Sequence, residues 1–247
     1  MSISADTRGD VVDPDEPSHW PAAVRALCEE WDLGVPATDY AGDLELGDDA
    51  DDALRAALQG HQVRAYHATR LLPHEVDSIR ADGLGVFSQQ LFDDRIDAAH
   101  THGHLTRSER NELRAAHMFA VGEDADRGNR SGLWATLRLA SLGRGGRDLM
   151  SSWGGEGIYF SSGATHLAPL LRRLGRPAIV VVAVAVASSW RQQGCYPSLD
   201  RVFLGAWRGL AGGCDLHVDQ PVPAADVLEI WRPGHSAYDA IRDLPAS

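Results

Sequence analysis

Two short segments combine residue types that could hold a planar ligand. The first is Tyr66-His67-Ala68-Thr69, in which an imidazole and a hydroxyl group lie two residues apart. The second is GEGIYF, residues 155–160, where the backbone at Gly157 could approach a ligand closely and Tyr159 could lie flat against a ring. Packing alone would explain the same letters, with His67 as a hydrogen-bonded histidine at a strand end and Tyr159 in the core.

A third segment, DLHVDQ (215–220), spaces Asp215, His217 and Asp219 two residues apart. On a strand, this spacing directs all three side chains to one face of the sheet.

The elements that must position these segments can be predicted from periodicity. QVRAYHAT (62–69) alternates like a strand, and HEVDSIRADGL (74–84) predicts a helix that Gly83 ends. AIVVVAVAVA (178–187) predicts a buried central strand, with short strands expected around 215–220 and 226–231. Helices and strands in separate runs favour an α+β fold.

Further helices are expected on both sides of the GEGIYF segment. Before it, we expect three helical stretches: LFDDRIDAA, the residues after the capping box Thr106–Glu109, and SGLWATLRLASLG (131–143). After it, THLAPLLRRLG (165–175) predicts a helix. Near the N-terminus a helix is expected from Ser18, as its cap, to Gly34, with Pro21 in the first turn.

In order and local spacing, HATRLLPHEVDSIRADGL and GEGIYFSSGATHLA resemble the ADP-ribosyltransferase superfamily, especially its diphtheria-toxin/poly(ADP-ribose)-polymerase branch. Those enzymes carry His-Gly-Thr/Ser at a strand end, a helix closing in Gly-Leu, a Gly-x-Gly-Ile-Tyr-Phe segment and a Glu on a later strand. The resemblance covers less than half of the chain.

The resemblance implies a split mixed or antiparallel sheet around a cleft for NAD, which is a co-substrate. It assigns His67 to the adenosine ribose and Tyr159 to stacking on the nicotinamide ring, with His217 and Asp215 at the position of the third catalytic residue. The remaining NAD-binding positions that it implies are Tyr66, Ala68, Thr69, Arg70, Gly157, Ser161 and Thr165.

The chain departs from the family pattern at three places. Ala68 replaces the usual Gly, and the long separation of His67 from Tyr159 predicts a helical insertion over 88–150. His217 stands where the family has its Glu, with Asp215 two residues before it. This departure favours mono-ADP-ribosylation of a macromolecule or small molecule over chain elongation. An NAD glycohydrolase, a relative of the RNA 2′-phosphotransferases and a catalytically silent binding module remain alternatives, as does an interaction protein built on the insertion.

Charge divides the chain into regions. Residues 1–60 hold 15 acidic side chains and three arginines, which accounts for the whole formal net charge of −12. We expect a disordered acidic tail over 1–17, an acidic helical segment over 18–60 and the catalytic domain over 61–247. The sequence lacks the stripe of basic residues that is typical of nonspecific nucleic-acid binding. The acidic region could be a solubility tail, a brake or a docking site for a basic partner.

The remaining features bear on metal binding, on location in the cell and on biological role. HTHGH (100–104) and His117 lack an accompanying set of metal ligands, so no metal is expected. Without a signal peptide, and with an apolar run too short for a membrane span, the chain is expected to be cytoplasmic with no membrane partner. A toxin or defence role would suit a bacterial enzyme of this fold. The acceptor, whether protein, nucleic acid or small molecule, and any cognate inhibitor stay open.

Overall fold

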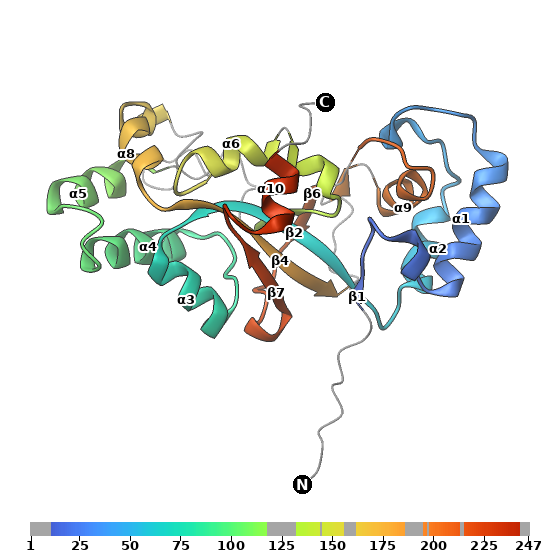
Figure 1. Cartoon of the computed structure of the whole chain (residues 1–247), viewed down its shortest axis with the longest axis horizontal. Coiled ribbons are helices and arrows are strands. Elements are labelled where there is room, and N and C mark those ends of the chain that lie inside the picture. Colours follow the sequence, from blue (N-terminus) through green and yellow to red (C-terminus); the bar gives the residue numbers. More distant parts are fainter. Residues whose placement is uncertain are drawn as a thin grey trace, which may run out of the picture.

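The structure is a computed structural model that describes residues 11–117, 132–143, 145–155, 162–185, 195–196, 198–212 and 215–242. In these residues one mostly antiparallel sheet lies in the middle of the molecule, with helices against both faces and at one end (Figure 1). The predicted α+β class is therefore confirmed. Of the predicted site residues, Gly157, Tyr159 and Ser161 lie outside the described residues.

The sheet is built around two long strands that pair along their whole length, from Gln62↔Ala185 to Leu71↔Arg176. Its order is β5-β6-β3-β2-β4-β7, and β1 pairs in parallel with β2. The strands are β1 (Val11–Val12), β2 (Gln62–Leu71), β3 (Leu133–Thr136), β4 (Arg176–Ala185), β5 (Cys195–Tyr196), β6 (Asp215–Val218) and β7 (Val227–Trp231).

Both faces of β4 are buried, which explains its unbroken apolar sequence. Val180 and Val182 lie in one core cluster, and Ile179 and Val181 lie in another on the opposite side of the sheet. We call these the first face and the second face.

The first face is covered by three helices on one side of the molecule, α1 (Ala22–Gly34), α2 (Ala50–Ala57) and α9 (Leu199–Trp207). Trp20 packs there against Phe203, with ring centroids 4.8 Å apart. The second face is covered by η4 (Leu139–Gly143), α6 (Gly145–Ser151) and α10 (Ser236–Arg242).

A helical lobe lies beyond the Leu71 end of β2 (Figure 1). It has its own core, which includes Phe92, Leu113 and Trp153. Its elements are α4 (Gln89–Thr101), α5 (Arg107–Ala116), η5 (Ser162–Leu167) and α8 (Ala168–Arg173), and α3 (Pro73–Asp82) connects the lobe to the sheet. Short 3-10 turns complete the described elements: η1 (Pro17–His19), η2 (Ala41–Asp43) and η6 (Ala224–Asp226).

Most predicted elements are confirmed: β2, β4, β6, β7, α3, α4, α5 and α8, as well as the capping box of α5. In that box Glu109 accepts the Thr106 N–H and the Thr106 hydroxyl accepts the Glu109 N–H. The N-terminal helix α1 forms as well, but Ser18 lies in η1, and Pro21 precedes α1 without a side-chain cap.

Two predictions were wrong. Residues 131–143 were expected to be helical, yet Leu133–Thr136 form β3. Leu133 and Ala135 pack on the first face, and the alternate residues Trp134 and Thr136, which pair with β6, lie on the second face. The segment 88–150 is thus not a purely helical insertion. Residues 11–17, expected to be disordered, contain β1 with Val12 buried.

Across the part of the chain that the structure describes, every helix is too short or too polar to cross a membrane.

Candidate functional site

A cavity of about 330 Å³ lies where β2 and β3 part. Among the described residues these strands pair at Tyr66↔Thr136. Past that pair, His67–Thr69 of β2 line the cavity, as do Leu133 and Trp134 of β3 and the preceding Gly132. Other walls come from α3, the connection from Gly83 to Phe87, α4, Leu149 and the pair Gly154-Gly155. A volume of this size is at the lower end of the range for small-ligand sites.

His67 is fixed in a defined tautomer at this cavity. Its Nδ1 lies 2.7 Å from the backbone oxygen of Trp134, and because a carbonyl only accepts, Nδ1 donates. Burial lowers the pKa of His67 to about 4, although the bond to Trp134 acts in the opposite direction. At neutral pH the ring is therefore uncharged, with Nε2 as a hydrogen-bond acceptor for a ligand hydroxyl or amide.

One buried carboxylate, that of Glu75, lies at the floor of the cavity and was not predicted from the sequence. Glu75 accepts hydrogen bonds from the Leu72 N–H (2.7 Å), the Trp153 indole (3.0 Å) and Arg95 Nε (2.7 Å). Burial would raise the pKa of Glu75, but the charge and hydrogen bond of Arg95, together with the other two donors, lower it. Glu75 and Arg95 neutralise each other at the cavity wall.

Arg95 is also fixed from its other side, since its guanidinium lies 5.0 Å from the centre of the Trp153 ring. The sequence held one signal for this network, Glu75 at the capping-box position of α3. That signal does not predict that the Glu75 side chain would meet Arg95.

The structure brings His67, Ala68 and Thr69 to the same cavity as Gly155, which begins the GEGIYF segment. His67 and Thr69 lie on the first face, while Ala68 packs in the second-face core with Leu142 and Met150 and reaches the cavity from there. Thr165 is exposed in η5 and is not a lining residue.

His217 and Asp215 are not brought to this cavity. Asp215 pairs with Thr136, which pairs with Tyr66, and directly paired residues point to the same side of a sheet. Tyr66 belongs to the second-face core, so Asp215 and His217 lie on the face opposite His67.

His217 is separated from the cavity by the backbone of β3. Its ring lies 5.0 Å from that of Trp134 and covers Gly132. Gly132 has φ +148°, and a Cβ there would overlap the His217 ring. The backbone of Gly132 thus faces the cavity on one side and His217 on the other.

Tyr66 and Arg70 also point away from His67. Burial raises the pKa of Tyr66, whose ring packs 5.6 Å from that of Trp231. Arg70 donates to three backbone carbonyls, those of Leu174 (2.6 Å), Met150 (3.3 Å) and Arg172 (2.6 Å). Its guanidinium thereby ties β2 to α6 and α8.

Within the described ranges, no cluster of His, Cys, Asp or Glu has the geometry to hold a metal ion. His100 instead lies in the last turn of α4, with Nδ1 2.8 Å from the Leu105 oxygen. His117 is buried beside Asp93, 3.5 Å away.

Fold and cavity together define an α+β protein with a small ligand-sized site at a break in its central sheet. Comparison with protein-family models, curated proteins and solved structures found no match.

Proposed function

We propose that the protein is an NAD-dependent mono-ADP-ribosyltransferase. It would cleave the bond between nicotinamide and ribose, transfer ADP-ribose to a nucleophilic acceptor, and release nicotinamide and the acceptor's proton. In the family that the sequence resembles, NAD lies in the gap of a split sheet.

The observation that carries the proposal is the convergence of two distant motif segments on one cavity. His67–Thr69 and Gly155, the first residue of the GEGIYF segment, are far apart in the chain and line the same cavity, at the point where β2 and β3 part. In the resembling family, the segments that correspond to these hold the two ends of NAD. The neutral, oriented imidazole of His67 is suited to a ribose hydroxyl, which would donate to Nε2.

A second candidate is favoured by the position of the third motif. His217 and Asp215 lie on the face opposite His67, behind the backbone of β3. A protein that binds NAD in the cavity but lacks an anion beside the scissile bond would be a binding module with no turnover. NAD glycohydrolase activity, with water as the acceptor, would need the same stabilisation.

The test measures NAD binding and NAD turnover on the same samples. Purified protein is incubated with NAD, free nicotinamide is followed by proton NMR, and the NAD-induced change in melting temperature is recorded. We expect His67→Ala to weaken NAD binding and to slow the release of nicotinamide by about tenfold each, since a lost hydrogen bond to a ligand costs about 1–2 kcal/mol. The weaker binding should appear as a smaller NAD-induced rise in melting temperature.

His217→Ala is the matched control, because it removes an imidazole behind the cavity wall. If His217→Ala abolishes turnover and leaves NAD binding intact, the site extends to the second face. Stabilisation by NAD with no nicotinamide release would establish the silent module. No stabilisation and no release would refute the proposal.

A further inference from the structure

The described residues include three histidines whose rings stack beside the cavity. The rings of His74 and His102 are nearly parallel, at 7°, with centroids 4.1 Å apart, and those of His74 and His104 are at 20° and 5.7 Å. We call these three side chains the histidine stack. His74 lies in the first turn of α3 and lines the cavity, whereas His102 and His104 lie in the turn between α4 and α5.

The turn that presents His102 and His104 has a defined backbone. His102 ends α4, with its N–H donating to the Ala98 oxygen (2.9 Å), and the His104 N–H donates to the Ala99 oxygen (2.9 Å). Between them Gly103 has φ +76°, a conformation that L side chains rarely adopt. The backbone of the turn therefore places the His102 and His104 rings against His74.

A metal ion does not explain this arrangement. Imidazole nitrogens bind a metal in the plane of their own ring, so a shared ion requires ring planes that converge on one point. The rings of the histidine stack are close to parallel, which directs their lone pairs along separate planes.

The surroundings of His74 favour its uncharged form. Both of its ring nitrogens are buried, and neither has a hydrogen-bond partner among the described residues. The charged or titratable groups that face it are Glu75 from its own helix, Arg95 from α4, and His102 and His104 from the turn. Since Glu75 is already bonded to Arg95, Leu72 and Trp153, a proton on His74 would meet no free acceptor.

We propose that the histidine stack is a proton-sensitive latch that holds the start of α3 against the turn between α4 and α5, and so keeps this side of the cavity closed. Uncharged imidazoles stack favourably, but two protonated rings at this separation repel each other. Acidification would then separate the two segments and widen the cavity at His74. The proposal does not depend on which ligand the cavity holds.

The direction of the pH effect follows from linkage. Burial, with Arg95 and the two other histidines, lowers the pKa of His74, whereas Glu75 raises it. A histidine whose pKa is lower in the folded state binds its proton more readily when unfolded. Its contribution opposes folding as the pH falls below about 6.5, and is absent above that value.

The test compares the wild-type chain with His102→Gln/His104→Gln, both without a polyhistidine tag. Histidine ring protons are followed by NMR between about pH 8 and pH 5, around the ordinary histidine pKa. In the wild type we expect the pKa of His74 to lie below its ordinary value, and in the double variant the His74 midpoint should move upward because two neighbouring imidazoles are lost. On acidification, the melting temperature of the double variant should also fall less than that of the wild type.

The control is His19→Gln, which removes an exposed histidine paired with Glu16. It should leave both the His74 midpoint and the pH dependence of melting unchanged. As a direct readout of opening, binding of 1-anilinonaphthalene-8-sulfonate should increase on acidification in the wild type more than in the double variant. An unshifted His74 midpoint in the wild type, or equal pH dependence in wild type and double variant, would overturn the latch.

Discussion

At the scale of single residues, the buried Glu75 side chain joins three separate parts of the molecule at the cavity. One carboxylate oxygen accepts from the Leu72 N–H and the Trp153 indole, and the other accepts from Arg95. These donors lie at the N-cap of α3, in the segment after α6, and on α4. The geometry of the cavity floor therefore depends on this one side chain.

We predict that Glu75→Gln lowers the free energy of unfolding by about 3 kcal/mol, because it leaves Arg95 without its counter-charge in a largely buried site. Since the pKa of Glu75 is lowered in the folded state, its contribution is present above about pH 4.3 and is lost as the pH falls through the lowered value. Urea denaturation at neutral and acidic pH measures both effects.

Glu112→Gln is the matched control. Glu112 pairs with His166 on the surface, where an ion pair contributes about 1 kcal/mol or less. Equal losses in the two variants would contradict the role given to Glu75.

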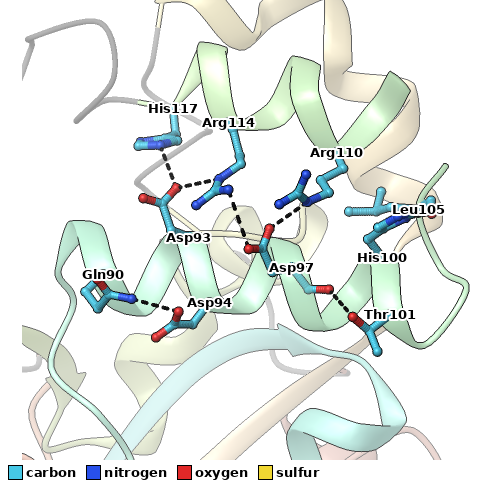
Figure 2. A network of polar contacts seen from close by, with 10 residues as sticks. All are labelled: Gln90, Asp93, Asp94, Asp97, His100, Thr101, Leu105, Arg110, Arg114 and His117. Carbon is cyan, nitrogen blue, oxygen red and sulfur yellow. Dashed lines mark hydrogen bonds and ion pairs between the residues drawn. The ribbon is translucent and has the colours of Figure 1, made fainter. Parts of the chain in front are cut away.

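At the scale of elements, α4 and α5 are joined by a ladder of ion pairs (Figure 2). Asp97 accepts from Arg110 Nε at 2.7 Å, and Asp93 accepts from Arg114 Nε at 3.2 Å. Asp93 also faces the buried ring of His117, 3.5 Å away. Burial lowers the pKa of His117 although Asp93 raises it, so the ladder ends on a histidine that burial favours in its neutral form.

We predict that Asp93→Asn lowers the melting temperature, by an amount that corresponds to about 1–2 kcal/mol, because Arg114 and His117 lose a shared partner that is only 19% exposed. Asp94→Asn is the neighbouring control, since exposed Asp94 bonds only to Gln90 among the described residues and an amide oxygen can accept the same bond. Thermal melts at low and high salt would check this, and a larger loss for Asp94→Asn would contradict it.

Elements also explain which parts of the site could be predicted. The strands β2, β4, β6 and β7 follow from alternation and apolar runs, and α3 and α5 follow from their caps. The motif Tyr66-His67-Ala68-Thr69-Arg70 could be read as one site from its letters. On a strand, however, Tyr66 and Arg70 point to the face opposite His67, so about half of a contiguous motif must serve packing.

The position of His217 could not be predicted for a different reason. Its face depends on register with β3, and β3 itself was not recognised because its four residues resemble a helical segment. Register over such a short strand is set by its neighbours in the sheet and not by its own sequence.

At the scale of the whole molecule, residues 11–16 form an N-terminal arm that fastens distant segments. Val11 and Val12 extend the sheet beside β2, and Asp13 lies 3.3 Å from Arg64. Asp15 accepts from Arg138 Nε at 2.6 Å and from the Leu139 N–H at 2.7 Å. Part of the acidic N-terminal region thus neutralises arginines of the sheet domain.

We predict that deleting residues 1–16 lowers the melting temperature by about 6–12 °C, as expected when about 3 kcal/mol is lost from a chain of this size. The reason is that Arg138, 8% exposed, would remain buried without its carboxylate. Deleting residues 1–10 is the control, because it keeps every contact of the arm given above. Calorimetry measures both chains, and equal melting temperatures would contradict the role of the arm.

The full-length pairing of β2 with β4 has a consequence for how the chain reaches its structure. Between Leu71 and its partner Arg176 lie α3, the helical lobe and β3, so the central pair cannot form until a ribosome has synthesised most of the protein. Non-local pairing of this kind slows folding. Until the two strands pair, the apolar strand β4 is exposed and can associate with other chains. A nascent or truncated product that ends before β4 leaves β2 unpaired in the same way, and we expect it to depend on chaperones.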